Sequence, residues 1–183
     1  MSRQLDEVLR GILGNDRVLR DEPMKNHTTF RVGGPARYFV SPKDSRELAA
    51  VLDACRRDGS PWFILGNGSN LLVSDRGFSG TVVDMGKGFT SIRVEGERIF
   101  AGAGLLLSQI ARKALEAGLS GLEFAAGIPG SLGGAVVMNA GAYGSEMKNV
   151  LESVLVLTPE GKEREISAGE LELGYRTSAV LKR

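Results

Sequence analysis

A twenty-residue run at positions 125 to 144, AAGIPGSLGGAVVMNAGAYG, limits the possible folds more than any other part of the sequence. It has no charged residue and contains six glycines. Glycine backbone can adopt positive φ and lets another group approach closely. Pro129, Gly130 and Ser131 are typical of a helix start, whose unpaired N–H groups can bind an anion. The pattern therefore predicts a segment in which main chain, and not charged side chains, holds a ligand.

The second half of this run suggests the shape of that ligand. Gly133, Gly134, Gly141 and Ala142 would let a flat ring lie against backbone, and Asn139 could hydrogen-bond the edge of the ring. A buried helix packed tightly on a sheet is the alternative. It would explain Gly133 and Gly134 but not the other four glycines of the run. A cofactor with a diphosphate and a ring, bound without Lys or Arg, is favoured.

A second glycine-rich loop, Gly66–Leu71 (GNGSNL), follows an apolar run at 62–65 that is predicted to be a buried strand. Successive N–H groups in such a loop can form an anion-binding nest, and the side chains at 67, 69 and 70 are neutral donors. An ordinary tight turn is the alternative. A Rossmann fingerprint is excluded because Leu71 takes the third glycine position and no crossover helix follows. A P-loop is excluded because no spaced glycine precedes a Gly-Lys-Ser/Thr.

The remaining pattern predicts an α+β fold. An amphipathic helix is expected at 3–13, and Asp44 with Glu47 forms a capping box for a second helix that stops at Gly59. A third helix is expected after Gly102-Ala103-Gly104. Further strands are expected at 36–40 and 81–85, with hairpins at 90–101 and 153–166. A β-α-β beginning followed by hairpins argues against a doubly wound sheet.

Composition excludes several classes of protein. The chain has 23 Lys and Arg against 22 Asp and Glu, with no basic block, so neither nucleic acid nor a membrane is expected as a partner. The single cysteine, Cys55, lies on an apolar helix face and is expected in the core, as suits a reducing compartment. No apolar leader or membrane span is present, so a cytoplasmic location is expected. No metal-ligand spacing occurs, and His27 is expected to have a solvent or hydrogen-bonding role.

Several motifs together resemble one family, the flavin-dependent UDP-N-acetylenolpyruvoylglucosamine reductases of bacterial peptidoglycan synthesis. They occur in the family's order, at residues 28–34 (TTFRVGG), 65–71, 121–146 and 175–178 (YRTS). The resemblance implies a two-lobed FAD-binding domain of the vanillyl-alcohol-oxidase type. It also implies NADPH as hydride donor and a UDP-sugar with an enolpyruvyl group as substrate. The product is UDP-N-acetylmuramate, which links the family to cell-wall biogenesis, cell shape and division.

The resemblance assigns roles to individual residues. The pyrophosphate would be bound by the Gly66–Leu71 loop and by the loop at 127–134. Arg176 matches the arginine that stabilises the enol-like intermediate, although Tyr175 to Ser178 alone would be typical of an exposed helix end. The cofactor-binding residues expected are Gly66, Asn67, Gly68, Ser69, Asn70, Leu71, Gly104, Ala126, Gly127, Gly130, Ser131, Gly133, Gly134, Asn139, Gly141 and Ala142.

The expected organisation is an N-terminal helix and lead-in at 1–22, a first lobe at 23–84 and a second lobe at 85–183. The family continues into a further lobe that binds the substrate and supplies the proton-donor serine. The motifs found in this chain include neither that lobe nor that serine, and Ser178 does not correspond to it. We therefore expect this chain to bind FAD but to turn over weakly or not at all. The alternatives are the FAD-binding part of another oxidoreductase of the same fold, or an FAD-binding module without catalysis.

Overall fold

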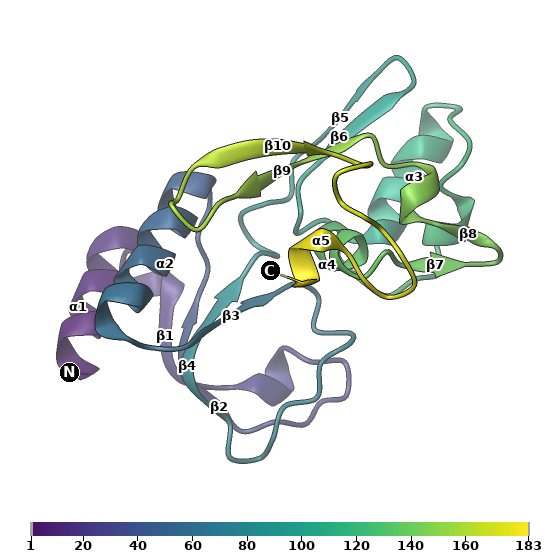
Figure 1. The fold of residues 1–183 in the computed structure, drawn as a ribbon. Helices are drawn as coiled ribbons and strands as arrows, with labels where there is room; N and C mark the ends of the chain where they lie inside the picture. Colours follow the sequence, from purple (N-terminus) through teal and green to yellow (C-terminus); the bar gives the residue numbers. More distant parts are fainter. Residues whose placement is uncertain (1, 183) are drawn as a thin grey trace. The chain divides into compact units, whose positions relative to one another are not determined.

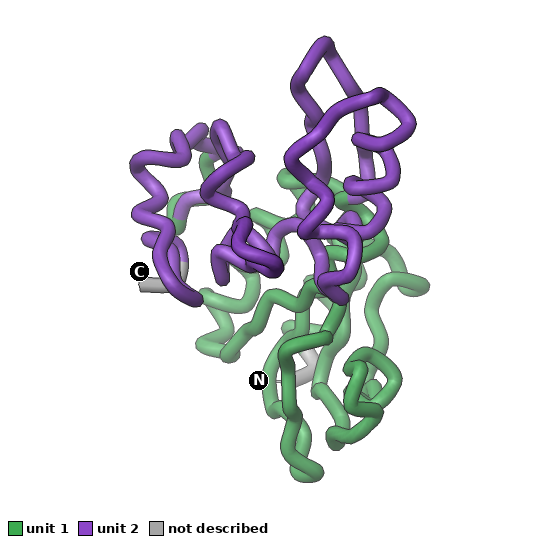
Figure 2. Tube along the Cα trace, turned by 90° about the vertical axis from the view of Figure 1, so that its right-hand side faces the viewer, with its two compact units in different colours: residues 1–89, 159–162 green, residues 90–158, 163–183 purple. Residues whose placement is uncertain are grey.

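The chain forms two compact units in a computed structural model that describes residues 2–182 (Figure 2). Unit 1 contains residues 1–89 and 159–162, and unit 2 contains residues 90–158 and 163–183. The boundaries expected from the sequence, at 22 and 84, differ from these. The first difference arises because the chain before residue 23 contributes a strand to the sheet of unit 1.

Unit 1 is built on a four-stranded sheet with the order β1-β2-β4-β3 (Figure 1). The strands are β1 (Val18–Pro23), β2 (Pro35–Val40), β3 (Trp62–Leu65) and β4 (Phe78–Asp84). β1 pairs antiparallel with β2, whereas β2 and β3 both pair parallel with β4. The strands predicted at 36–40 and 81–85 are confirmed, but β1 was not predicted, because its pairing with β2 and not a local pattern makes it a strand.

Two helices accompany this sheet, α1 (Ser2–Leu13) and α2 (Ser45–Asp58), and they pack against each other (Figure 1). Both were predicted. The Asp44 side chain accepts a hydrogen bond from the Glu47 amide at 2.8 Å, and Gly59 ends α2 in the left-handed conformation. Cys55 is buried in the core, and burial raises the pKa of its thiol.

One ion pair, between Arg17 and Glu47, connects the first turn of α2 to the segment just before β1. The Arg17 guanidinium donates to both carboxylate oxygens of Glu47, and Glu47 also accepts from the Lys43 amide at 2.9 Å. The hydrogen bonds from Arg17 lower the pKa of Glu47 to about 2, from a usual value of 4.5. Glu47 is therefore a charged structural residue and not a titrating one at neutral pH.

The prediction that β3 is buried is wrong. Trp62, Phe63 and Ile64 are 42, 42 and 38% exposed, and only Leu65 is buried. β3 is an edge strand of the sheet, so in the described part of the chain only one side of it is paired. An apolar run of four residues looks the same in a sequence whether a strand is central or at an edge.

Unit 2 combines three hairpins with short helices (Figure 1). Its core gathers Leu107, Ile110, Phe124, Val136 and Leu171. Its strands are β5 (Ile92–Glu95), β6 (Arg98–Ala101), β7 (Gly141–Ala142), β8 (Ser145–Glu146), β9 (Ser153–Leu157) and β10 (Glu163–Ser167), and its helices are α3 (Leu107–Glu116), α4 (Leu132–Val137) and α5 (Ala179–Lys182).

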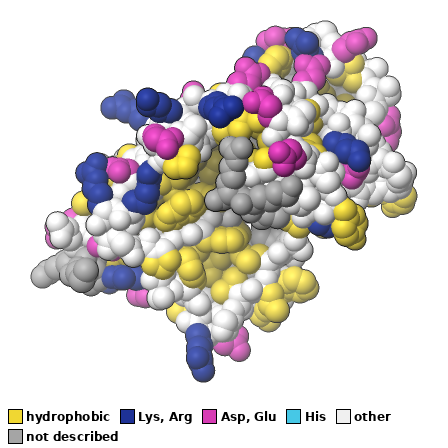
Figure 3. Space-filling model, viewed as in Figure 1, with side chains coloured by type: hydrophobic (Ala, Val, Ile, Leu, Met, Phe, Trp, Pro, Cys, Tyr) yellow, Lys and Arg dark blue, Asp and Glu magenta, His cyan; other side chains and the backbone are white. Residues whose placement is uncertain are grey.

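The predicted hairpins at 90–101 and 153–166 are confirmed as β5–β6 and β9–β10, and the mixed helix and strand content confirms the α+β class. α3 was also predicted; Leu107, Ile110 and Ala114 on this helix are buried, whereas Leu115 is 78% exposed. In Figure 3, charged side chains of both signs lie mainly around the margins of the face shown, whereas hydrophobic side chains cover much of its centre. None of the described helices is long and apolar enough to cross a membrane.

Candidate functional site

The glycine loop of unit 1, Gly66–Leu71, is folded against residues 27–29. The Thr29 amide donates to the carbonyl oxygen of Gly68 at 3.2 Å. Gly68 has a φ of 63°, and a Cβ atom there would lie 2.0 Å from the carbonyl oxygen of His27. The protein's own backbone packing therefore requires glycine at this position, irrespective of any ligand.

The polar side chains of the same loop remain available. Among the residues that the structure describes, Asn67, Ser69 and Asn70 make no side-chain hydrogen bond to protein. Asn67 and Asn70 are exposed, and Ser69 is half-buried. Hydroxyl and amide groups without a protein partner suit a ligand that is bound by neutral donors.

His27 supports the neighbouring segment and does not point to covalent chemistry. Its ring stacks on Phe39 with 3.9 Å between ring centroids, and its Nε2 atom lies 2.9 Å from Oε1 of Glu22. These two contacts hold the segment whose carbonyl oxygen touches Gly68. The expected hydrogen-bonding role of His27 is confirmed.

In unit 2, the loop before α3 and the loop before α4 are hydrogen-bonded to each other. The Leu107 amide donates to Gly130 O at 2.9 Å and the Leu132 amide to Leu105 O at 2.8 Å. The Gly133 amide donates to Ala103 O at 2.8 Å. This bonding explains why a run of small residues is placed beside Gly102-Ala103-Gly104.

These bonds correct the sequence interpretation of the helix start. α4 does begin at Leu132, but it has only six residues, and its first two N–H groups are already bound by the 103–105 segment. Among the backbone N–H groups at the start of α4, those of Ser131 and Gly134 have no protein acceptor in the described part of the chain. Individual amides, and not a helix dipole, are what this loop can offer an anion.

Gly127 stands apart from the other glycines of the run. Among the described residues, no atom lies within 4 Å of the position that a Cβ would occupy, and its φ is not in the left-handed region. By contrast, a Cβ at Gly133 would lie 3.0 Å from Ala103 Cβ, and one at Gly141 would lie 2.6 Å from Glu146 Cβ. The fold of this chain gives no reason for glycine at 127, so an open cradle for a bound group fits this position.

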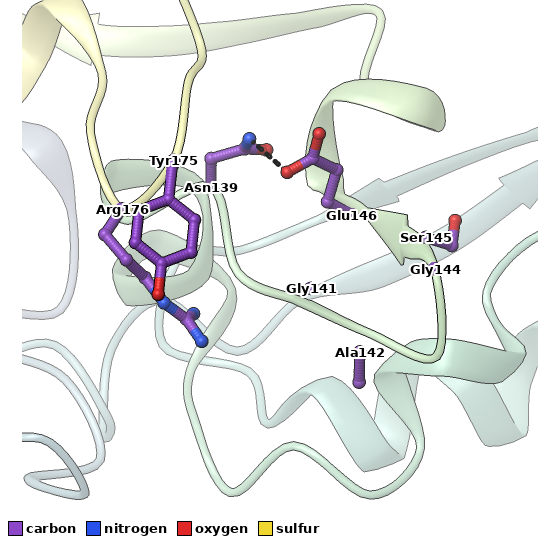
Figure 4. Close-up of a pocket in the computed structure, with 8 residues that line it drawn as sticks. All are labelled: Asn139, Gly141, Ala142, Gly144, Ser145, Glu146, Tyr175 and Arg176. Carbon is purple, nitrogen blue, oxygen red and sulfur yellow. Dashed lines mark hydrogen bonds between the residues drawn. The ribbon is translucent and has the colours of Figure 1, made fainter.

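An open pocket of about 340 Å³ lies in unit 2, where the β7–β8 hairpin meets the turn at 174–177 (Figure 4). It brings the predicted residues Asn139, Gly141 and Ala142 together with the predicted catalytic residue Arg176. The other predicted site residues do not line it. Sequence reasoning missed four of its lining residues as site residues: Gly144, Ser145, Glu146 and Tyr175.

Asn139 does not have a free amide, as the sequence interpretation assumed. Its Nδ2 donates to Glu146 Oε2 at 2.8 Å and to Gly174 O at 3.2 Å. Its Oδ1 accepts from the Lys148 amide at 3.0 Å. The residue is 2% exposed and has a φ of 42°. Both amide protons are used inside the protein, so Asn139 joins segments of the site and is not available to donate to a ring edge.

Arg176 lies in a two-residue turn and not at a helix end. Gly174 N donates to Thr177 O at 3.1 Å, and Thr177 N donates to Gly174 O at 3.3 Å. Arg176 has a φ of 52°, which is unfavourable for a residue with a side chain. Its guanidinium carbon lies 5.8 Å from the centre of the Tyr175 ring, and it makes no ion pair with any described residue. The pocket therefore contains an unpaired cation.

Strain supports a functional interpretation of this pocket. Asn139, Tyr143 and Arg176 all have positive φ, and each lies in or beside the pocket. Non-glycine residues in this conformation are concentrated at functional sites, where the surrounding structure imposes the geometry. Among the described residues, no group of His, Cys, Asp and Glu side chains could hold a metal ion.

Comparison with known proteins agrees with this picture. A family model described as an FAD binding domain matches residues 36–167. A UDP-N-acetylenolpyruvoylglucosamine reductase of Alkaliphilus oremlandii is 45% identical over 176 residues, which is 96% of this chain and 58% of the relative. The corresponding reductase of Heliobacterium modesticaldum is 49% identical over 162 residues, which is 88% of this chain and 52% of the relative.

Solved structures show the same fold. The UDP-N-acetylenolpyruvylglucosamine reductase of Thermus caldophilus matches with a TM-score of 0.74 and 40% identity, over 88% of this chain and 56% of that one. A p-cresol methylhydroxylase matches with a TM-score of 0.71 at 15% identity, over 93% of this chain and 36% of that one, which shows a shared fold alone.

The chain spans between half and three-fifths of the length of these curated reductases. The sequence motifs predicted a resemblance to the FAD-binding part of these reductases, and the comparisons confirm it. They also confirm the predicted vanillyl-alcohol-oxidase type of fold. Since the family model covers most of the sequence, the chain belongs to the FAD binding domain family.

Proposed function

We propose that this chain is the FAD-binding part of an NADPH-dependent reductase that converts UDP-N-acetylenolpyruvoylglucosamine to UDP-N-acetylmuramate in peptidoglycan synthesis. The main observation behind the proposal is the pocket of unit 2, which is lined by Arg176, whose guanidinium has no ion-pair partner among the described residues, and by the small residues Gly141 and Ala142. The names of the most similar relatives supply the substrate class.

The residues present fit FAD as a cofactor. Gly127 is open, and the Ser131 and Gly134 amides lack protein acceptors among the described residues. Asn67, Ser69 and Asn70 offer further neutral donors in unit 1. FAD, when bound, supplies the group that accepts hydride from NADPH and passes it to a carbon–carbon double bond. We propose that the other predicted cofactor residues line the FAD site with their backbone, and that Asn139 has a structural role instead.

Arg176 is the residue proposed to act on the substrate. Reduction of an enolpyruvyl group places negative charge on the substrate beside its carboxylate, and a guanidinium can stabilise that charge through two parallel N–H donors. The backbone of Arg176 lies in a hydrogen-bonded turn, so the position from which its side chain extends is defined before the charge develops. Replacing Arg176 with Ala should lower the maximal rate of substrate reduction by about 10²–10³-fold.

The experiment that tests the proposal follows the visible absorption spectrum of the purified chain in three steps. FAD is added first, NADPH next under anaerobic conditions, and the enolpyruvyl UDP-sugar last. The proposal predicts a structured flavin band, its loss with NADPH and a slow return with the sugar, because only weak turnover is expected of this chain by itself. A chain that binds FAD but is indifferent to the UDP-sugar would instead be an FAD-binding module of another kind. A chain that stays colourless in excess FAD would contradict the cofactor assignment itself.

A further inference from the structure

Asn139 is the best-bonded side chain in the unit 2 pocket. Both of its amide protons and its amide oxygen have protein partners, and it is almost completely buried. The three partners belong to three segments: β8 through Glu146, the 3₁₀ turn Met147–Asn149 through the Lys148 amide, and the turn that contains Arg176 through Gly174. A buried amide with this bonding fixes the geometry of everything it joins.

Glu146 fixes Asn139 in turn. Its Oε2 accepts from Asn139 Nδ2, and its Oε1 forms an ion pair with Lys148 Nζ. Figure 4 shows the Glu146 and Asn139 side chains pointing toward each other across the pocket rim. Because an ionised carboxylate can only accept hydrogen bonds, Glu146 determines that the NH₂ end of the Asn139 amide, and not its oxygen, points toward it. The second proton of that NH₂ group is then the one that reaches Gly174 O.

The turn at 174–177 needs such support. Its two backbone bonds, at 3.1 and 3.3 Å, are long, and Arg176 adopts a left-handed φ that a side chain disfavours. Tyr175 and Arg176 are both exposed, so their side chains add little packing. The bond from Asn139 to Gly174 O ties the start of this turn to a buried part of unit 2.

We propose that Asn139 and Glu146 form a positioning pair that fixes the turn carrying Arg176 and so orients its guanidinium for the negatively charged reaction centre. The role proposed for the pair is exerted through Arg176. The catalytic role of the oriented guanidinium rests on the proposed function, whereas the claim that the pair fixes the turn does not.

The variants are chosen to separate loss of the side chain from backbone strain. Asn139→Gly removes the amide but tolerates the φ of 42°. Glu146→Ala removes the acceptor, and Glu146→Gln keeps an acceptor oxygen. Gln109→Ala is the matched control, because it deletes a side-chain bond to the Leu106 amide in the same unit, away from the turn.

The first readout is cleavage of the Arg176–Thr177 bond by trypsin, quantified by mass spectrometry against cleavage after Arg112 in α3. We expect Asn139→Gly and Glu146→Ala to accelerate cleavage after Arg176 about tenfold, because a tied turn must open before it enters a protease. Glu146→Gln and Gln109→Ala should stay within about twofold of the unmodified chain. Equal rates in Asn139→Gly and the unmodified chain, or equal acceleration by Gln109→Ala, would overturn the proposal.

The second readout divides the reaction of the FAD-loaded chain into two halves. Asn139→Gly should slow the return of flavin absorbance on addition of the enolpyruvyl UDP-sugar by about tenfold or more, with KM for the sugar little changed. FAD affinity and the loss of absorbance with NADPH should not change. Slowing of both halves alike would contradict a positioning role. If the unmodified chain fails to bind FAD or ignores the sugar, the proposed function fails, while the trypsin result still decides whether the pair fixes the turn.

Discussion

The two glycine-rich regions of this molecule use glycine for different purposes. In unit 1, a Cβ at Gly34, Gly68 or Gly77 would lie 2.0 Å from a backbone carbonyl oxygen of the same unit. In unit 2, Gly127 has no described atom within 4 Å of its Cβ position and its φ is not in the left-handed region. Glycine enrichment alone therefore does not indicate a ligand. It can indicate one only where neither close packing nor a positive φ requires glycine, as at Gly127.

The largest effect on folding is expected for Gly68→Ala in unit 1. The new methyl group would overlap the carbonyl oxygen of His27, and φ is positive, so the free energy of unfolding should fall by about 3 kcal/mol or more. Urea denaturation measures this. Gly59→Ala is the control, since Gly59 has a similar φ of 68° but no described atom within 4 Å, and it should cost only about 1 kcal/mol. Equal losses would mean that close packing is not what requires Gly68.

A smaller loss is expected for Glu47→Gln, which weakens the ion pair with Arg17. At neutral pH the free energy of unfolding should fall by about 1–2 kcal/mol, since charge-assisted hydrogen bonds are replaced by neutral ones. The folded pKa of about 2 lies below the usual 4.5, so this stabilisation is present above pH 4.5 and is lost as the pH falls toward 2.

Denaturation curves of the unmodified chain and of Glu47→Gln, recorded between neutral pH and pH 2, measure this loss of stabilisation. The difference between them should be constant above pH 4.5 and shrink to near zero by about pH 2. A difference independent of pH would show that the charge of Glu47 is irrelevant. Glu7→Gln, an exposed carboxylate of α1, serves as the control, and FAD affinity should change in neither variant.

Arg176→Gly should leave the fold intact or stabilise it by up to about 1 kcal/mol, because glycine relieves the left-handed φ. The same change removes the only unpaired cation among the residues that line the pocket, so reduction of the UDP-sugar should be lost. Thermal unfolding and the sugar-dependent return of flavin absorbance measure the two effects. A clear loss of stability would show that the Arg176 side chain packs structurally.

The smallest effect on folding is expected for Gly127→Ala. The free energy of unfolding should stay within about 0.5 kcal/mol, as the methyl group meets no described atom and φ is ordinary. FAD should nevertheless bind at least about tenfold more weakly if the cofactor lies against this backbone. Unfolding curves and FAD titrations of the same preparation measure both. Unchanged FAD affinity would remove Gly127 from the site.

Local signals explain what the sequence predicted well. The Asp44 cap and Gly59 fix the ends of α2 within a few residues, and each confirmed hairpin has its turn residues beside its strands. β1 and the edge position of β3 depend on partners far along the chain, so no local pattern reveals them. Motif order identified the family where periodicity alone could not.

The candidate site was only partly accessible to sequence reasoning. Arg176, Asn139, Gly141 and Ala142 do meet at one pocket. However, the bonding of Asn139 to Glu146 and Gly174 joins positions 7 and 35 residues apart, and nothing in the sequence shows which groups are already paired. The amides of Leu132 and Gly133 were assumed free for the same reason, but the segment 103–105 accepts from both.

The most direct test is an FAD titration followed by amide NMR signals of the isotope-labelled chain. We expect the signals of Gly127, Ser131 and Gly134 to move and saturate with FAD, because those backbone positions are open or lack a protein acceptor. The Leu132 and Gly133 amides, already bonded to unit 2, should move less. Saturable binding that leaves Gly127, Ser131 and Gly134 unmoved would contradict the claim that open glycine backbone holds the cofactor.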